Sequence, residues 1–294
     1  MRAALALLFV CLTAAVLAAQ EPAQAPTFRA TTRLVPLPTM VTDAEGRLVP
    51  ELTQEDFTIL DDGKPQEIAL FENTVQPLRV VILLDSSIST TAVFDRIKQA
   101  AEAFILRLLP EDEAQVGAFS SKIQLSGSFT NNRDALIGAL DELQYGNETR
   151  MRDAIDAAVT ELEGEDERRV ILLLTDGEDF GSKNGMRSVR ERAQRENVMV
   201  YGVGLRLMFA GNMSNPDGDL RKLAEATGGG YFVLKDTAEL NATFTRVAQE
   251  LHSLYSIGFV PQTLDGKEHK IQVRMKEPGH KARTRATYIA AVQD

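Results

Sequence analysis

The sequence has one cysteine, no tryptophan and no surplus of positive charge. Cys11 lies near the N-terminus, so the rest of the chain can form neither a disulfide nor a thiolate metal site. Lys and Arg total 32 against 42 Asp and Glu, which gives a formal net charge of −10. A nucleic-acid-binding protein needs basic surface to neutralise phosphates, so this balance argues against nucleic acid as a partner. Cations and basic surfaces are better candidates.

Only one apolar run in the sequence approaches the length of a membrane span, and it lies at the N-terminus. Residues 3–17 form an apolar run, Arg2 precedes it, and the small pair Ala18-Ala19 comes just before a polar stretch. This pattern is typical of a secretory signal peptide, and the run is short for a membrane span of about 20 residues. We therefore expect a signal peptide over 1–19, no membrane span in the mature chain, and export to the periplasm or the extracellular space. An uncleaved membrane anchor is the alternative.

The rest of the composition is that of a folded protein. Apolar residues make up 44% and charged residues 25% of the 294 residues, which is enough chain to bury a sizeable core. Patterning divides it into a central part between two β-rich flanks. We predict an N-terminal β segment over 27–78, an α/β domain over 79–255 and a C-terminal β segment over 256–292.

The central part alternates solid apolar runs with helical patterns. Strands are predicted at 80–84, 170–174 and 198–205, and helices at 94–108, 151–162 and 240–254. Apolar runs without alternation are typical of strands that helices cover on both faces. Strands that alternate with helices predict a doubly wound, mostly parallel sheet of the α/β class.

Each β-rich flank is too short to form a stable core by itself. A segment of about 40 to 50 residues is near the size below which an independent core is marginal. Asp61-Asp62-Gly63 and Asp265-Gly266 predict turns between apolar runs within the flanks. We expect the two flanks to meet in one small β-sandwich, from which the α/β domain projects as an insertion.

Oxygen-bearing side chains gather where two predicted strands end. The first strand runs into Asp85, Ser87 and Ser89, the second runs into Asp176, and Thr149 stands just before a predicted helix. Ligands of open α/β sheets bind beyond the carboxyl ends of the strands. Carboxylates and hydroxyls are hard donors that suit Mg²⁺, Mn²⁺ or Ca²⁺, whereas zinc and copper favour thiolate or imidazole. We expect these side chains to hold one divalent cation and to leave a position for an Asp or Glu carboxylate of a protein partner.

These residues resemble the metal-ion-dependent adhesion site (MIDAS) of von Willebrand factor type A (VWA) domains, which are related to integrin I domains. The resemblance rests on Asp85-x-Ser87-x-Ser89, Thr149 and Thr175-Asp176-Gly177. In the flanks, 52–57 and 255–259 resemble exported bacterial "VWFA-related" proteins. The resemblance implies a Rossmann-like VWA fold and metal-dependent binding of a protein, and it leaves the partner open.

One feature departs from the family's pattern. Arg150 and Arg152 stand where the family more often has small or apolar residues. If they point inward, they weaken the metal but attract an acidic ligand. Because Arg is rarely fully buried, we expect them to point outward and to be solvated.

Other readings of the same residues remain open. Asp85-x-Ser87-x-Ser89 alone is also compatible with a helix N-cap. A metal-assisted or serine hydrolase would need a general base, but the histidines His252, His269 and His280 lie in a predicted helix or the C-terminal flank, and the sequence has no Gly-x-Ser-x-Gly elbow. A structural envelope protein with a fold-stabilising ion is a third possibility. We predict a binding protein rather than an enzyme.

Overall fold

The computed structural model describes residues 34–164, 167–177, 179–209, 211–216 and 218–292. The expected signal peptide over 1–19 and Cys11 lie outside these residues. None of the helices within the described ranges combines the length and the apolar character needed to cross a membrane.

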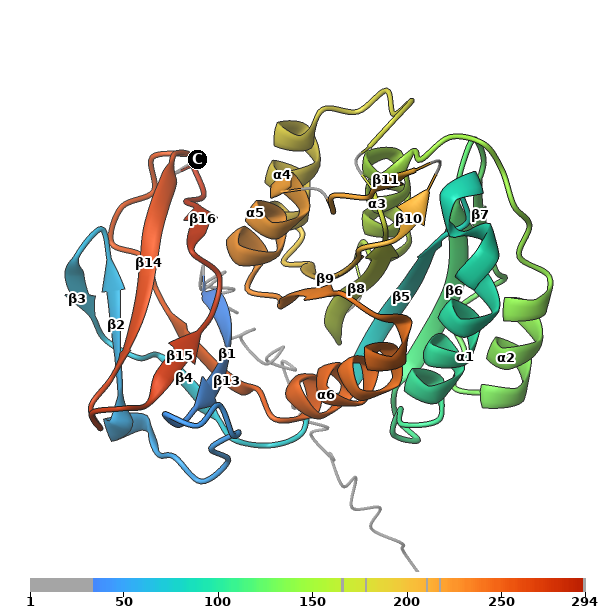
Figure 1. Cartoon of the computed structure of the whole chain (residues 1–294). Helices are drawn as coiled ribbons and strands as arrows, with labels where there is room; N and C mark the ends of the chain where they lie inside the picture. The colour runs from blue at the N-terminus through green and yellow to red at the C-terminus, as the bar shows by residue number, and fades with distance from the viewer. Residues whose placement is uncertain (1–33, 165–166, 178, 210, 217, 293–294) are drawn as a thin grey trace, which may run out of the picture. The chain divides into compact units, whose positions relative to one another are not determined.

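A six-stranded sheet forms the centre of the α/β part (Figure 1). Its strands are β5 (Leu78–Asp85), β6 (Glu113–Phe119), β7 (Ile123–Leu125), β8 (Arg168–Thr175), β9 (Met199–Leu205) and β12 (Tyr231–Leu234). They are ordered β12-β9-β8-β5-β6-β7, and all neighbours are parallel except β6 and β7. The predicted mostly parallel sheet is therefore confirmed.

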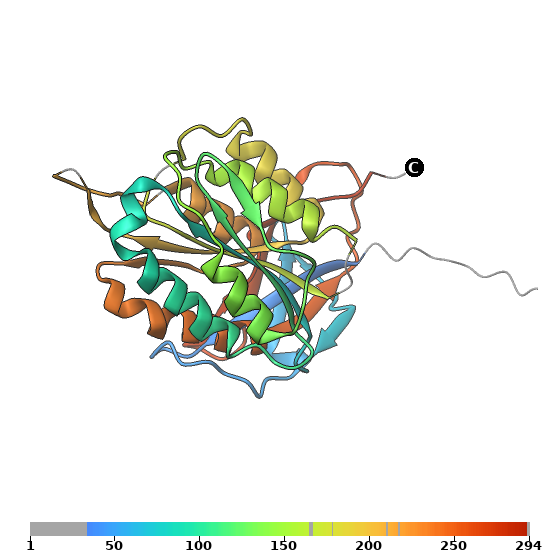
Figure 2. The ribbon, with the colours of Figure 1, turned by 90° about the vertical axis from the view of Figure 1, so that its right-hand side faces the viewer.

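Helices cover both faces of this sheet (Figure 2). They are α1 (Phe94–Ile105), α2 (Arg133–Asp141), α3 (Met151–Glu161), α4 (Met186–Arg195), α5 (Gly218–Thr227) and α6 (Leu240–His252). Val80 and Ile82 of β5 pack in one cluster with α1, α2 and α6, whereas Val81 and Leu83 pack in another with α3, α4 and α5. Because both faces of β5 are buried, its sequence shows no alternation of apolar and polar residues.

Short elements complete the connections of this part. They are the 3-10 helices η2 (Ile88–Val93) and η3 (Thr237–Glu239) and the hairpin of β10 (Met208–Phe209) and β11 (Asn212–Met213). The segment η2 follows β5 directly and leads into α1. It therefore carries the loop on which part of the candidate site lies.

The two flanks combine in a pair of antiparallel four-stranded sheets. The strands are β1 (Val35–Thr42), β2 (Phe57–Asp61), β3 (Lys64–Gln66), β4 (Leu70–Glu72), β13 (Tyr255–Phe259), β14 (Glu268–Met275), β15 (Lys281–Arg283) and β16 (Thr287–Ile289), with the 3-10 helix η1 (Gln54–Asp56) before β2. The sheet orders are β15-β1-β13-β4 and β16-β14-β2-β3, so each sheet takes strands from both flanks. Leu37 and Ile257 of the first sheet share one apolar cluster with Ile59 and Val273 of the second. The predicted β-sandwich of the two flanks is confirmed.

The two predicted turns have different roles in this sandwich. Asp62 and Gly63 have φ of 47° and 80° and join β2 to β3 as a two-residue hairpin. The turn at Asp265-Gly266 instead lies between β13 and β14, which belong to different sheets. The turn residues therefore predict both turns of the chain. They do not predict which strands pair, because that depends on packing between the flanks.

Candidate metal centre

The residues predicted to bind metal lie on loops at the carboxyl ends of β5 and β8 and before α3. Asp85 is the last residue of β5, and Asp176 directly follows β8. These strands are neighbours, and Leu84 pairs with Leu174 in their parallel register. The register therefore places Asp85 beside the end of β8, although the two segments are far apart in the sequence.

Hydrogen bonds join four of the five predicted ligands. Asp85 Oδ1 accepts from the Ser87 N–H at 2.9 Å, and Asp85 Oδ2 accepts from the Thr175 hydroxyl at 2.6 Å. The Ser87 and Ser89 hydroxyls share a hydrogen bond of 3.1 Å. The Ser89 hydroxyl donates to Asp176 Oδ1 at 3.0 Å. The structure thus brings two carboxylates and two hydroxyls into one connected group.

Thr149 lies in a loop that is attached to the same edge of the sheet. Its backbone exchanges hydrogen bonds with Phe180, at 3.1 Å and 2.9 Å, and the nearby Gly146 N–H donates to Ser86 O at 3.0 Å. Within the described part of the chain, no hydrogen bond joins the Thr149 side chain to the other four predicted ligands. Its role as a ligand therefore stays a prediction.

The electrostatics of the group suit a cation. Burial raises the pKa of Asp85 to about 6, against the hydrogen bonds from Ser87 and Thr175, and the Asp176 carboxylate acts in the same direction as burial. Burial also raises the pKa of Asp176, against the hydrogen bond from Ser89. Both side chains are nearly inaccessible, with Asp85 at 0% and Asp176 at 1% exposure. Two ionised carboxylates buried near each other lower the stability of the fold unless a positive charge compensates them.

One oxygen of this group has no hydrogen bond within the part of the chain that the structure describes. Asp176 Oδ2 is buried and has no hydrogen-bond partner among the described residues. An orphaned carboxylate oxygen next to hydroxyl oxygens is the donor set that Mg²⁺, Mn²⁺ or Ca²⁺ prefers. The residues present therefore fit a divalent cation.

The two arginines beside the site are paired rather than solvated. Arg150 Nη2 lies 2.6 Å from Asp153 Oδ2, and Arg152 Nη1 lies 4.0 Å from Asp179 Oδ1. Their side chains are 24% and 29% exposed, while those of the two aspartates are only 5% and 4% exposed. The expectation of a solvated side chain is wrong for Arg150, because its guanidinium donates to the buried Asp153 carboxylate. Arg152 lies near Asp179, but no hydrogen bond joins the two side chains among the described residues.

Asp153 also fastens a loop that follows β8. It accepts hydrogen bonds from the backbone N–H groups of Lys183 and Asn184 at 2.9 to 3.1 Å. Burial alone would raise the pKa of Asp153, but these bonds and the Arg150 guanidinium lower it below its usual value. Sequence reasoning missed this role, and the only available signal was the spacing of three residues between Arg150 and Asp153 on one helix.

Large apolar side chains are exposed on the loops that carry the site. Ile88, Tyr145 and Phe180 are 54%, 51% and 71% exposed. The Tyr145 ring packs on Phe94, with 4.9 Å between centroids, and Phe180 pairs through its backbone with Thr149. We call Ile88, Tyr145 and Phe180 the apolar rim. Exposed apolar groups beside a polar centre are typical of protein-binding surfaces, and no periodicity in the sequence could have revealed them.

Known proteins resemble this chain in both sequence and fold. A UPF0353 protein of Mycobacterium ulcerans is 22% identical over 220 residues, which cover 66% of each protein, so the chain spans about two thirds of this relative's length. A solved structure of a von Willebrand factor type A protein from Catenulispora acidiphila has a TM-score of 0.54 at 14% identity, and the match covers 90% of this chain and 75% of that one.

A second solved structure adds information about a metal site in another protein. Proximal thread matrix protein 1 of the mussel byssus, described with a zinc-occupied MIDAS motif, has a TM-score of 0.54 at 16% identity, and the match covers 63% of this chain and 48% of that one. At such identities these likenesses show a common fold. The sequence model for the von Willebrand factor type A domain matches residues 80–246, which contain every predicted metal ligand. The chain belongs to the von Willebrand factor type A domain family.

Proposed function

We propose that the protein is an exported binding module, which holds a divalent cation at Asp85, Ser87, Ser89, Thr149 and Asp176 and uses it to bind a protein partner. The observation that carries the proposal is the buried Asp176 Oδ2, which has no hydrogen-bond partner among the described residues and belongs to a connected group of oxygen donors. When bound, the cation supplies a positive centre for an Asp or Glu carboxylate of the partner.

Hydrogen bonds within the chain already orient the two carboxylates that would bind the cation. The Thr175 hydroxyl and the Ser87 N–H fix both oxygens of Asp85. The Ser89 hydroxyl fixes one oxygen of Asp176 and leaves the other free of hydrogen bonds within the described residues. Preorganised ligands reduce the entropy that binding a cation would otherwise cost.

The apolar rim defines the kind of partner that this site suits. Ile88 follows Ser87 directly in the sequence, and the backbone of Phe180 pairs with that of Thr149. Each of these two apolar residues therefore lies next to a predicted ligand. A partner that presents an acidic side chain between apolar side chains would satisfy the cation and cover the exposed rim together. Apolar contact of this kind contributes most of the affinity in protein interfaces, while the carboxylate gives specificity.

Binding is favoured over hydrolysis by the surroundings of two of the three histidines. His252 Nε2 lies 2.7 Å from Asp112 Oδ2, and His269 contacts Asp61 in the sandwich. Both are therefore engaged away from the serines of the candidate site. A hydrolase reading would predict turnover that is lost in Asp85→Ala, and this assay separates the two functions.

Calorimetry on the mature protein tests the cation site. We expect Mg²⁺ or Mn²⁺ to bind the wild type and Asp134→Asn, which changes an exposed aspartate at the start of α2. Asp176→Asn should lose this binding, because it removes a carboxylate charge from the site. Zn²⁺ and Ca²⁺ belong in the same series, since the mussel protein has a zinc-occupied MIDAS. Equal binding by the wild type and Asp176→Asn would contradict the proposed site.

Recovery of partners tests the binding function itself. The mature protein, immobilised and incubated with cell-envelope extract, should retain partners in Mg²⁺ and release them in EDTA. The same partners should be missing with Asp176→Asn and present with Asp134→Asn. Equal recovery with Mg²⁺ and with EDTA would refute a metal-dependent binding function.

A further inference from the structure

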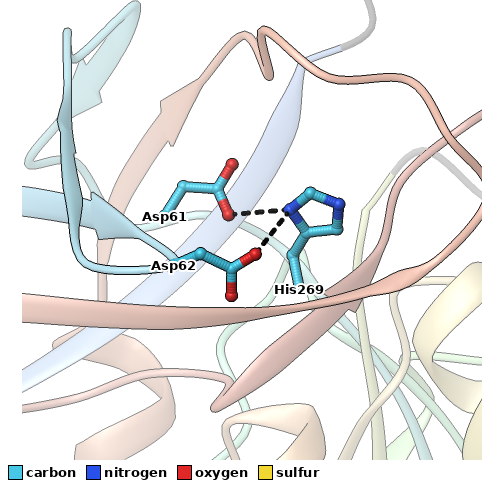
Figure 3. A group of neighbouring side chains, drawn as sticks. All are labelled: Asp61, Asp62 and His269. Carbon is cyan, nitrogen blue, oxygen red and sulfur yellow. Dashed lines mark hydrogen bonds and ion pairs between the residues drawn. The ribbon is translucent and has the colours of Figure 1, made fainter.

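A second group of metal-ligating side chains lies in the sandwich (Figure 3). Asp61 ends β2, Asp62 begins the turn to β3, and His269 lies near the start of β14. The antiparallel pairing of β2 with β14 places Asp61 opposite Ile271, and the Asp62 N–H donates to Lys270 O at 2.9 Å. Pairing between the two flanks therefore brings these side chains together.

Two of the spacings among the three inner atoms match those of ligands around one ion. His269 Nδ1 lies 3.2 Å from Asp61 Oδ1 and 3.2 Å from Asp62 Oδ2, and these atoms all lie within 4.8 Å of one another. Ligands at about 2.0 to 2.1 Å from an octahedral or tetrahedral ion are about 2.8 to 3.4 Å from their neighbours. His269 Nδ1 is thus already spaced from each carboxylate oxygen as a ligand of a common cation would be.

The outer atom of each side chain is held by a different group. His269 Nε2 lies 3.1 Å from Asp265 Oδ1. Asp61 Oδ2 accepts from the Tyr288 hydroxyl at 3.0 Å, and Asp62 Oδ1 accepts from the Lys270 N–H at 3.0 Å. Histidines that bind metals usually donate their other ring N–H to a carboxylate or carbonyl, which fixes the ring. Asp265 is placed for this role toward His269.

The inner atoms require a positive charge between them. If the ring proton is on Nε2 and bonds to Asp265, the lone pair of Nδ1 faces oxygens of Asp61 and Asp62. Three acceptors at these distances repel one another unless a second proton or a metal ion lies among them. A proton on Nδ1 can point at only one of the two oxygens, whereas a metal ion can bind all three atoms.

Charge and access also agree with a metal ion. Asp61 is buried at 7% exposure, while the Asp62 side chain is 53% exposed, so the group is reachable from solvent. Among the described residues, the cations that form ion pairs with this group are His269 and Lys267, whose Nζ lies 3.9 Å from Asp265 Oδ2 on an exposed side chain. Within these ion pairs the three aspartates outnumber the two positive groups even when the imidazole is protonated.

We propose that Asp61, Asp62 and His269 form a second divalent-cation site, selective for Zn²⁺ and similar borderline ions over Mg²⁺ and Ca²⁺. The imidazole nitrogen is the basis of this selectivity, because Mg²⁺ and Ca²⁺ prefer ligand sets made only of oxygen. The ion connects the β2–β3 hairpin of the N-terminal flank to β14 of the C-terminal flank. Its binding therefore stabilises the sandwich. The site is independent of the proposed function.

The experiment uses the mature chain carrying Asp176→Asn, so that the VWA site does not contribute. Calorimetry with Zn²⁺ should show one bound ion, and Mg²⁺ at the same concentration should show none. Adding His269→Gln should weaken Zn²⁺ binding at least tenfold, and adding His280→Gln, a matched change elsewhere in the flank, should leave it unchanged. Thermal unfolding should show a rise in Tm with Zn²⁺ that His269→Gln removes.

A second measurement does not depend on the folding of any histidine variant. Nitrogen-15 NMR of the histidine rings in the Asp176→Asn protein should show a shift of His269 Nδ1 on addition of Zn²⁺. Absence of Zn²⁺ uptake, or an unchanged His269 signal, would overturn the proposal and assign the position between the carboxylates to a proton. Equal Zn²⁺ affinity with and without His269→Gln would overturn it as well.

Discussion

The Arg283 guanidinium donates to the buried Glu250 carboxylate at 2.6 Å and so connects the sandwich to the last helix of the VWA domain. Arg283 lies on β15, and Glu250 lies on α6 with 1% of its side chain exposed. The same guanidinium donates to the Tyr201 hydroxyl of β9 at 3.0 Å. The Arg283 side chain of β15 therefore bonds to both α6 and β9. These contacts join the β-sandwich to the VWA domain.

Loss of this contact should destabilise the protein. Arg283→Met removes the guanidinium but keeps much of the apolar stem. Among the described residues, it leaves Arg246, at 3.0 Å, as the ion-pair partner of the buried Glu250 carboxylate. Because Arg246 still pairs with the carboxylate, the loss is that of one hydrogen bond between charged groups, about 1.5 to 3 kcal/mol. We expect the free energy of unfolding in urea to fall by about this amount. Arg274→Met, an exposed change on β14, should alter it little, and equal effects of the two changes would contradict this role of Arg283.

The turn after α5 should not tolerate a side chain at Gly229. An added Cβ would overlap the backbone oxygen of Val200, which is fixed in the central sheet. Gly229→Ala should therefore lower the free energy of unfolding by about 2 kcal/mol or more, through displacement of the backbone.

Gly138 provides a control in which the same substitution should raise the free energy of unfolding. It lies inside α2, and an added Cβ would meet nothing within 4 Å. Gly138→Ala should stabilise the protein by about 0.5 to 1 kcal/mol, because alanine favours the helix. Urea unfolding of both variants measures the two effects, and destabilisation of similar size in both would rule out the steric explanation.

The Asp153 carboxylate should make stability near the VWA site depend on pH. Its pKa is lowered in the folded protein, so its contribution is complete above the unfolded value of about 3.9 and is lost as the pH falls through the lower folded value. Asp153→Asn keeps the shape but removes the charge that Arg150 and two backbone N–H groups bind. We expect a loss of about 2 kcal/mol at pH 7.

The pH dependence distinguishes charge from shape in this variant. Urea unfolding at pH 7 and at pH 3 should give a large difference between wild type and Asp153→Asn at the higher pH and a smaller one at the lower pH. An equal difference at both values would mean that the charge of Asp153 does not contribute. Asp134→Asn, an exposed change on α2, serves as the control at each pH.

The α/β part could be predicted because its signals are local. The run Val80 to Leu84 has no polar residue, since helices cover both faces of β5, and this alone indicates a central strand. The positions of Asp85 and Asp176 at strand ends follow from the same reasoning. The sequence could not show that Asp176 Oδ2 has no hydrogen-bond partner among the described residues, because this depends on the register of β5 against β8.

Features that depend on distant segments were missed for the same physical reason. Arg150 is paired because Asp153 is one turn away and because the loop at 183–184 closes over that carboxylate. The sequence shows the spacing but not the loop. His269 and Asp61, which are 208 residues apart, likewise meet through the pairing of β2 with β14. Long-range strand pairing is decided by the packing of whole sheets, not by local pattern.

The apolar rim should contribute to partner binding without contributing to cation binding. Phe180 is 71% exposed, so Phe180→Ser removes apolar surface from the rim at little cost to the fold. We expect Phe180→Ser to lower the recovery of Mg²⁺-dependent partners from cell-envelope extract at least tenfold, while calorimetry shows unchanged affinity for the cation.

Val260→Ser is the matched control for this prediction. Val260 is 43% exposed and follows β13 in the sandwich, so it tests whether any loss of exposed apolar surface has the same effect. Its recovery of partners should equal that of the wild type. If Phe180→Ser also retains full recovery, the rim is not part of the binding surface. If it loses the cation as well, the loop at Phe180 acts through Thr149, to which it is paired, because the change would then have disturbed the metal centre itself.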